Sequence, residues 1–407
     1  MNARREQGVV TAAGFLRSVA VGMSGVLVAI DLASRGWDVR DAGVLVSAGL
    51  AGIALNTLLT SLWADRFGRR RTLLILGALS ALGGLALVFL DSRPLLLVAA
   101  FVGMVNGLGR DRGPAYALDQ AVLSGVVSAE RRTFALAWYS MLLDIGLAVG
   151  SLLAGLPFLL REQAGFGAAE SYRAAWLVYA VISAIAAVLY VFLSRDVEVN
   201  GNAPGWGMPR VAPESRSRIF RLAALTGMDS LGGGFLSGAL VSFWFFQRFG
   251  VGEETIGLLY FGARVANAAS HLAAAWLARR IGLLNTMVFT HIPSSLFLIS
   301  VAFAPTFGWA VVLFLLREGL VEMDVPTRQS YILAVVRPEE RTIASGVTPL
   351  TRNNAYAIAP ALAGVTMQTV SLASPLFFGG GIKIAYDVLL YFSFRRVKPP
   401  EEQSPKS

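Results

Sequence analysis

The sequence predicts an all-α membrane protein in which twelve transmembrane helices form two pseudo-symmetric six-helix bundles. The composition, the length of the apolar runs and an internal repeat together predict this fold class. Hydrophobic residues make up 55% of the 407 residues, charged residues only 15%, and the mean hydropathy is +0.60. A soluble core of this size needs fewer apolar residues, so we expect the excess to lie in a bilayer.

The apolar residues are gathered in runs whose length suits a membrane. A helix of about 20 apolar residues spans the hydrocarbon core of a bilayer. The runs are Val9–Ala33, Gly43–Trp63, Thr72–Leu90, Leu95–Val127, Phe134–Leu160, Ala174–Leu193, Ile219–Phe246, Ile256–Leu277, Leu283–Ala304, Gly308–Val336, Ile343–Thr369 and Leu372–Phe394. The fourth, tenth and twelfth runs also carry charged residues.

The two halves of the sequence repeat each other. Residues 120–135 recur 209 positions later as residues 329–344, with Gln, Val-Val, Glu, Arg, Thr and Ala in register. Duplicated halves are a recurring design of secondary transporters. Between the halves lies a stretch rich in Pro, Gly and charge, which is typical of a linker. We therefore expect a first bundle at 1–194, a cytoplasmic linker at 195–218, a second bundle at 219–396 and a disordered tail at 397–407.

The net charge of +9 is explained by its position along the chain. If the amino terminus is cytoplasmic, twenty Lys and Arg residues outside the runs fall on the cytoplasmic side, against six on the other. This is the positive-inside pattern, so the charge needs no nucleic-acid partner. It predicts the cytoplasmic (inner) membrane, with both termini in the cytoplasm. The first run carries Arg17 and is long for a signal peptide, so we expect it to be retained.

The residue types exclude several kinds of chemistry. The chain has no cysteine, which excludes disulfides and thiolate metal sites. Its two histidines lie in separate runs and do not favour a metal site. No nucleophile with a base and no metal-ligand spacing is found, so we expect neither a cofactor nor an enzyme.

The loop after the second run carries a family signature. Residues 61–71 read Ser-Leu-Trp-Ala-Asp-Arg-Phe-Gly-Arg-Arg-Arg. This resembles the Gly-x-x-x-Asp-Arg-x-Gly-Arg-Arg loop of the major facilitator superfamily, with Ser61 in place of the first glycine. The matching loop of the second half, residues 276–282, retains Gly282 and an arginine pair but lacks the acid. The resemblance covers about residues 9–396 and implies alternating access to a central site.

This loop and the repeated segments predict a conformational gate. The resemblance implies that Asp65 meets the amino terminus of the eleventh helix, where backbone N–H groups favour negative charge. Gly68 is expected to permit the turn. The repeats place an acid at the start of the next helix, where it serves in capping and ion pairing. The gate candidates are Ser61, Asp65, Arg66, Gly68, Arg69, Arg70, Glu130, Arg132, Glu339 and Arg341.

Charged residues inside the runs are functional candidates, because each costs about 2.5 kcal/mol or more at the centre of a bilayer. Glu318 and Glu322 lie one helical turn apart and repel, so one of them is expected to hold a proton more tightly. With Asp111 and Asp144 they are our candidates for proton coupling. The alternative is that the two glutamates merely neutralise arginines such as Arg317.

The arginines in the apolar runs indicate the chemical class of the solute. Arg110 and Arg112 precede Pro114, which should break the fourth helix and free backbone groups for a ligand. Planar guanidinium groups suit a carboxylate or phosphate, although a structural ion-pair network is the alternative. The solute-binding candidates are Arg17, Arg110, Arg112, Asp229, Arg328, Arg352 and Asn353. Lys383 and Asp387, four residues apart, predict a local ion pair.

These patterns predict a secondary active transporter that works as a monomer. We expect proton-coupled movement of a small polar or anionic organic solute, a metabolite or a drug, with export slightly favoured over uptake. An uptake symporter of the same fold and a transport-inactive receptor are the alternatives.

Overall fold

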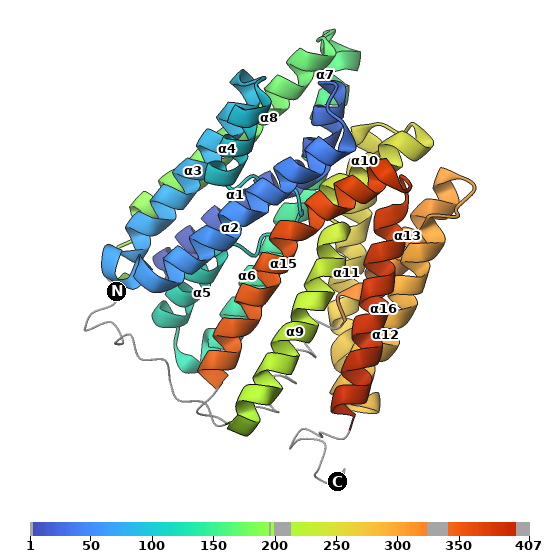
Figure 1. Ribbon diagram of the computed structural model, residues 1–407. Helices are drawn as coiled ribbons and strands as arrows, with labels where there is room; N and C mark the ends of the chain where they lie inside the picture. Colours follow the sequence, from blue (N-terminus) through green and yellow to red (C-terminus); the bar gives the residue numbers. More distant parts are fainter. Residues whose placement is uncertain (1–2, 195–196, 199–212, 324–340, 396–407) are drawn as a thin grey trace. The chain divides into compact units, whose positions relative to one another are not determined.

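The computed structural model describes residues 3–194, 197–198, 213–323 and 341–395, and within these ranges it contains helices and no strand. Figure 1 shows the helices along the chain. They are α1 (Ala3–Ser34), α2 (Val39–Phe67), α3 (Arg69–Phe89), α4 (Arg93–Gly103), α5 (Pro114–Val126), α6 (Ala129–Leu153), α7 (Leu156–Ala164), α8 (Ala168–Leu189), the 3-10 turn η1 (Tyr190–Phe192), α9 (Pro213–Phe235), α10 (Gly238–Phe249), α11 (Glu253–Ile281), α12 (Leu283–Val301), α13 (Phe307–Val321), α15 (Arg341–Thr369) and α16 (Ser374–Phe394).

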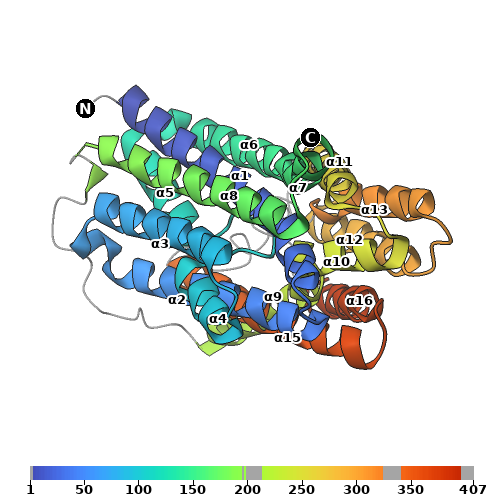
Figure 2. The same cartoon turned by 90° about the horizontal axis from the view of Figure 1, so that it is seen from above.

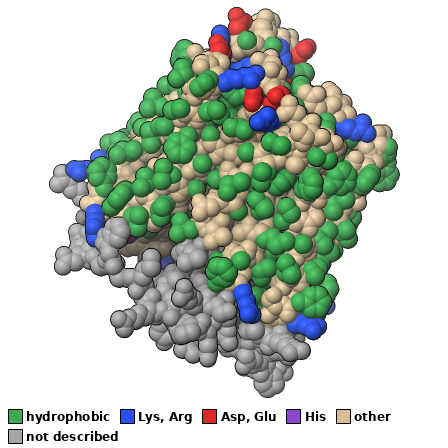
Figure 3. Space-filling view, in the orientation of Figure 1, with side chains coloured by type: hydrophobic (Ala, Val, Ile, Leu, Met, Phe, Trp, Pro, Cys, Tyr) green, Lys and Arg blue, Asp and Glu red, His purple; other side chains and the backbone are tan. Residues whose placement is uncertain are grey.

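The all-helical prediction is confirmed. Seven helical stretches among the described residues are long and apolar enough to cross a membrane: Arg4–Ser34, Val39–Phe67, Arg69–Phe89, Phe134–Ala164, Ala168–Phe192, Leu283–Val301 and Ser374–Phe394. The other predicted spans are interrupted, partly outside the described residues or less apolar, so the number twelve stays a prediction. On the face drawn in Figure 3, hydrophobic side chains cover the lengths of the helices. Phe89, for example, is 74% exposed, and surface of this kind suits contact with lipid.

Three of the predicted spans are divided. The fourth run forms α4 and α5, separated by the non-helical residues 104–113. Pro114 is the first residue of α5, where its missing N–H costs nothing, and the predicted break is therefore confirmed. The fifth run is divided between α6 and α7, and the seventh between α9 and α10.

The chain divides into two compact units. The first contains Met1–Gly205, Ser237–Phe261 and Pro360–Thr369, and the second contains Trp206–Leu236, Gly262–Ala359 and Val370–Ser407. Most of the predicted linker, and all of the tail at 397–407, lie outside the described residues, so the predicted boundaries stay predictions. One of the places at which the chain passes between the units is the junction of α9 and α10, from Leu236 to Ser237.

The first unit is built around α1. This helix packs against α6 and α8, and the three lie next to one another in Figure 2. Small residues permit the close approach: a Cβ atom on Gly150 would lie 2.0 Å from the carbonyl oxygen of Val19. Helix α3 packs on α8, and α2 on α4. Most of α1 is therefore removed from the surface, which explains why its Arg17 needs partners.

The second unit contains a row of three helices. α16 packs against both α9 and α12, and α12 also packs against α13; Figure 1 shows α9, α16 and α12 side by side. Met287, Tyr386 and Leu390 belong to a buried apolar cluster between α12 and α16. The row matters because charged side chains lie between these helices.

Candidate functional site

The break in the fourth span meets the break in the seventh. Ser24 of α1 donates to the carbonyl of Asn106 at 2.9 Å, which fixes the loop between α4 and α5. The loop carbonyls of Gly107 and Leu108 then accept the first free N–H groups of α10, at 3.0 and 3.3 Å. Backbone groups freed by both breaks are thus satisfied by each other, as a membrane interior requires.

A buried charge cluster lies beside this loop. The Nε of Arg17 donates to Asp111 at 2.9 Å, and one Nη donates to Asp119 at 2.8 Å. The same Nη donates to the hydroxyl of Tyr190 at 2.7 Å, and the other Nη donates to that of Tyr139 at 3.1 Å. Both tyrosines in turn donate to Asp119. The guanidinium is therefore held on all sides by protein groups; we call these five residues the Arg17 cluster.

The Arg17 cluster is unbalanced in charge. It contains one guanidinium and two carboxylates, so its formal charge is −1 when both acids are ionised. Uncompensated charge is costly in a low-dielectric interior. Uptake of one proton would make the cluster neutral.

A small cavity lies against the cluster. It has a volume of about 60 Å³ and is lined by Arg17, Asp111 and Tyr190 together with Ser80, Asn106 and Ser183. Sites for organic ligands usually measure about 300–1,000 Å³, so this cavity suits a few water molecules. It offers water access to the carboxylates and does not accommodate a solute.

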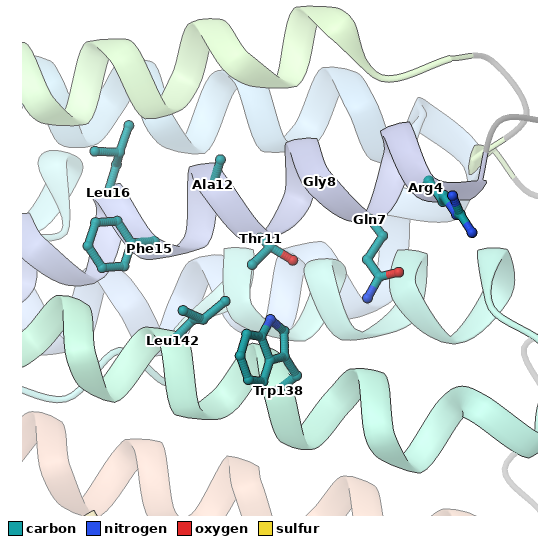
Figure 4. Close-up of a pocket in the computed structure, with 9 residues that line it drawn as sticks. All are labelled: Arg4, Gln7, Gly8, Thr11, Ala12, Phe15, Leu16, Trp138 and Leu142. Atoms are coloured by element: carbon teal, nitrogen blue, oxygen red, sulfur yellow. The ribbon is translucent and has the colours of Figure 1, made fainter.

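A larger groove runs between α1 and α6. Its volume is about 710 Å³, and its lining is mostly apolar. Figure 4 shows Gln7 and Thr11 of α1 pointing toward Trp138 of α6, with Phe15 and Leu142 farther along and Arg4 near the other end. One cation and two hydrogen-bonding side chains in an apolar slot suit an amphipathic anion.

The predicted solute-binding residues are scattered over the structure. Arg17 is in the cluster described above. Arg110 is half-buried, and exposed Arg112 lies over the ring of Tyr116 at 4.8 Å. Arg352 and Asn353 are half-buried on α15, and Arg328 lies outside the described residues. A direct contact of any of these with solute therefore stays a prediction.

The second unit has its own buried charge cluster. Lys383 of α16 donates to Asp229 of α9 at 2.7 Å. Asp387, one turn farther along α16, instead accepts from the ring of His291 on α12 at 2.9 Å. The local Lys383–Asp387 pair expected from the spacing is thus replaced by contacts to other helices. Asp229 and Arg17, two of the predicted solute-binding residues, each have an oppositely charged partner within their own unit.

The predicted proton carriers lie in different surroundings. Buried Glu318 pairs with buried Arg317, which is the neutralising role considered as an alternative. Helix α13 ends at Val321, so Glu322 is its C-cap residue. Asp111 belongs to the Arg17 cluster, and Asp144 is half-buried on α6. Proton transfer by any of these four acids stays a prediction.

The family loop adopts the turn expected of it. Gly68 has φ 108°, a value that only glycine favours, so its predicted role is confirmed. Its counterpart Gly282 has φ 87°. Asp65 pairs with Arg69 at 2.7 Å, and Glu198 accepts from the N–H of Arg69 at 2.6 Å, at the amino terminus of α3. Glu198 therefore occupies the kind of helix end at which we expected Asp65.

The other gate candidates are described only in part. Ser61 donates to the carbonyl of Leu58 within α2, and Arg66 and Arg132 are exposed. Arg70 donates its N–H to Glu198 at 3.3 Å. Glu130 lies in the first turn of α6, as predicted. Glu339 lies outside the described residues, and Arg341 is the first residue of α15. The contact of Asp65 with the eleventh helix stays a prediction.

Second-half segments of the sequence pack on first-half helices at one end of the first unit, where the α1–α2 loop lies. Buried Glu253, the first residue of α11, accepts from Arg161 of α7 at 2.5 Å. The N–H of Ala361 in α15 donates to the hydroxyl of Ser47 in α2 at 2.8 Å. We call these contacts, together with the glycine approaches described next, the seam.

Glycines keep the seam tight. A Cβ atom on Gly257 of α11 would lie 2.3 Å from the carbonyl oxygen of Ser151. A Cβ atom on Gly43 of α2 would lie 2.4 Å from the carbonyl oxygen of Pro360. Neither position has room for a side chain, so backbones from the two sequence halves are in direct contact at this end.

Sequence reasoning missed the polar partners that complete both clusters. Tyr139 and Tyr190 lie in apolar runs, where a tyrosine is expected to pack in the apolar core rather than to bind a charged group. His291 carried no signal beyond its position in a membrane span. For Lys383 the signal was its charge in a span, but the spacing pointed to the wrong partner.

The comparisons with known proteins agree with this architecture. The family model of the Major Facilitator Superfamily matches residues 10–348 and 222–407. An uncharacterized membrane protein of Saccharomyces cerevisiae is 24% identical over 423 residues, covering 96% of this chain and 94% of its own.

Two solved structures show the same fold. The nucleoside transporter NupG has a TM-score of 0.78 and 11% identity, covering 96% of this chain and 100% of its own. A D-xylose–proton symporter has a TM-score of 0.75 and 13% identity, covering 100% of both chains. The chain is therefore a multi-pass membrane transporter rather than an enzyme, and it belongs to the Major Facilitator Superfamily.

Proposed function

We propose that this chain moves a small polar or anionic organic solute, a metabolite or a drug, across the cytoplasmic membrane by proton-coupled alternating access. Export is slightly favoured over uptake. The bundles at 1–194 and 219–396 would rock against each other, joined by the linker at 195–218. Both termini would lie in the cytoplasm, and the monomer would be the working unit.

One observation carries the proton coupling. Each unit contains a cluster in which one cation lies with two carboxylates: Arg17 with Asp111 and Asp119, and Lys383 with Asp229 and Asp387. Burial penalises net charge, so each cluster gains by binding a proton. A small cavity gives water access to the first cluster. Proton binding in a membrane interior of this kind is typical of coupled transporters.

The groove supports the solute class. Its volume of about 710 Å³ fits an organic molecule. Arg4 supplies a positive charge, Gln7 and Thr11 supply hydrogen bonds, and Trp138 supplies an aromatic face. An organic anion with an apolar body would use all of these groups.

The seam supports alternating access. If the amino terminus is cytoplasmic, the α1–α2 loop faces outward and the seam closes the outer end of the transporter. Arg161, Glu253 and the close glycine contacts are then the groups that must separate when the transporter opens outward. Reversible contact between sequence halves at one end is what such a mechanism requires.

Flux in proteoliposomes under an imposed pH gradient tests the function. A pH-sensitive dye in the lumen would report proton movement after addition of each member of a panel of anionic metabolites and drugs. We expect proton movement with at least one solute, and the direction of the productive gradient distinguishes export from uptake. Binding without flux would instead favour the transport-inactive receptor.

The chain offers a matched control because it has no native cysteine. In the double variant Ser47→Cys/Ala361→Cys, a short bis-maleimide, which adds to both thiols, would hold the seam closed. Flux should disappear on cross-linking and persist in the uncross-linked protein. Flux that continues at full rate through the cross-linked protein would refute the outward-opening step. Glu318→Gln and Glu322→Gln test whether those acids carry the proton.

A further inference from the structure

The cluster of the second unit contains a side chain that the first lacks, an imidazole. His291 on α12 lies between Asp387 and Lys383, both on α16: its Nδ1 is 2.9 Å from Asp387, and its Nε2 is 3.3 Å from the Nζ of Lys383. Lys383 also donates to Asp229 at 2.7 Å. His291 and Asp387 are each 1% exposed. We call these four residues the His291 cluster.

The partners of His291 fix its neutral form. A lysine ammonium can only donate, so Nε2 must accept from Lys383 and the ring proton must lie on Nδ1. That proton is donated to Asp387. The hydrogen bonds then run from Lys383 to His291 to Asp387, and separately from Lys383 to Asp229. With two carboxylates and one ammonium, the formal charge is −1.

The described residues around the cluster carry few other charges. Among the described residues of α13, which packs on α12, Arg317 and Glu318 carry opposite charges and pair with each other. Tyr386 of α16 meets the ring of His291 edge-on, with centroids 6.1 Å apart. The exposed Arg221 is the other described charged side chain on α9. The four residues of the His291 cluster sum to a formal charge of −1, and one added proton brings that sum to zero.

Proton uptake changes which side chain binds Asp229. A proton added at Nε2 forms an N–H bond and ends the acceptance from Lys383, because both groups are then donors. The new donor has an acceptor close by: Oδ1 of Asp229 is 4.0 Å from Nε2. The imidazolium and the ammonium then compete for Asp229, and like charge drives them apart. The bond from Lys383 to Asp229 is weakened as a result.

That bond lies close to one of the places at which the chain passes between the units. Asp229 precedes the end of α9 by less than two helical turns, and the chain passes from the second unit to the first at Leu236–Ser237. Gly232 allows α9 to approach α16 here, since a Cβ atom on it would lie 3.0 Å from the carbonyl oxygen of Gly379. The Lys383–Asp229 bond thus joins α9 to α16 near this crossing.

We propose that the His291–Asp387 pair binds the coupled proton and that its uptake releases Asp229 from Lys383, freeing α9 to move. Proton coupling of transport, as proposed above, is a premise of this step. The proton enters and leaves as such, with no other bond made or broken. The site differs from the four acids chosen from the sequence, which lie on other helices.

The state of His291 can be measured without knowing the solute. The chain has only two histidines, so ¹⁵N-histidine labelling gives two ring systems, and the His271→Gln variant assigns them. At high pH we expect the His291 signals of a neutral Nδ1–H ring, and at low pH those of an imidazolium. An Nε2–H ring at high pH, or a ring that stays neutral down to pH 4, would overturn the assignment.

The conformational consequence is tested in the full chain reconstituted in proteoliposomes. The Ser47→Cys variant places one thiol in the seam, and its labelling rate by an impermeant maleimide reports opening. We expect labelling to rise at least about fivefold as pH falls, the low end of typical coupling strengths. The rise should vanish in His291→Gln and Asp387→Asn and persist in the control His271→Gln.

Two outcomes separate failure of the site from failure of the function. No pH response in the Ser47→Cys parent would contradict proton coupling itself. A pH response that survives both His291→Gln and Asp387→Asn would refute this site and leave the coupling intact. Asp229→Asn should imitate the protonated state, with fast labelling at every pH. Size-exclusion chromatography of each variant confirms that it is folded.

Discussion

The two buried clusters hold the same formal charges and stabilise them with different side chains. Around Arg17, a planar guanidinium donates to two carboxylates and two tyrosines, and both tyrosines donate to Asp119. Around Lys383, an ammonium donates to one carboxylate and one imidazole. Arginine stays charged and forms fixed forks, whereas histidine changes charge near neutral pH. A proton taken up by the first cluster would therefore have to bind a carboxylate, whereas the second cluster also offers an imidazole.

Loss of Arg17 should have the largest effect on stability. Arg17→Met leaves Asp111 and Asp119 buried without their cation, and breaking a buried pair in this way costs about 3–5 kcal/mol. The free energy of unfolding, measured by titration with SDS, should fall by this amount. Arg66→Met, at an exposed site, is the control and should change stability by less than about 0.5 kcal/mol.

A double variant sharpens this prediction. Adding Asp119→Asn to Arg17→Met removes one of the two unpaired charges, so at least half of the lost stability should return. If the double variant is less stable than Arg17→Met alone, the loss comes from packing rather than from charge.

Lys383→Met should cost less, and its cost should depend on pH. It takes the ammonium from one carboxylate, Asp229, while Asp387 keeps its contact to His291, whereas Arg17→Met takes the cation from two carboxylates. We expect a loss of about 3 kcal/mol at pH 8, the low end of the cost of breaking a buried pair. Acid favours the protonated, neutral carboxylate, so the loss should shrink as pH falls toward 5. Equal loss at both pH values would show that the loss comes from packing rather than from the charge of Asp229.

The sequence predicts the fold to the extent that a local pattern determines it. Run length and composition predict helices in a membrane, and Pro114 and Gly68 act through their own backbone geometry, so their positions could be read directly. The repeat predicts two similar halves. The boundaries of the compact units could not be predicted in this way. They depend on contacts such as those of the seam, which join residues far apart in the sequence, for example Gly257 and Ser151.

The sequence could indicate which charged residues belong to the candidate sites, but not which residues pair with them. The cost of a charge in a bilayer singles out Arg17, Asp111 and Asp229. Their partners lie up to 173 residues away, as with Tyr190 and Arg17, and helical spacing gives no information at that distance. For Lys383 the spacing even favoured a neighbour on the same helix over Asp229. Such partners require the packing of α9, α12 and α16 to be known.

Removal of one tyrosine hydroxyl should have a moderate effect. Tyr139→Phe and Tyr190→Phe each take a hydrogen bond from fully buried Asp119, and bonds to charged groups contribute about 1.5–3 kcal/mol. The unfolding free energy should fall by that amount in each variant. In Tyr391→Phe, where the ring packs against Phe289 and Phe392, we expect a change below about 0.5 kcal/mol. If Tyr190→Phe leaves the unfolding free energy unchanged, Arg17 and Tyr139 satisfy Asp119 without the Tyr190 hydroxyl.

The smallest effect on stability is expected for His291→Gln, the variant with the largest expected effect on the pH response. A glutamine amide can donate to Asp387 and accept from Lys383, as the neutral imidazole does, so the unfolding free energy at pH 8 should change by less than about 1 kcal/mol. At pH 5 the parent can protonate His291 and the variant cannot. A pH-dependent difference between the two proteins in SDS titration would therefore measure the proton that His291 binds. If the two stabilities run parallel from pH 8 to pH 5, His291 keeps one charge state throughout, and the second cluster is as fixed as the first.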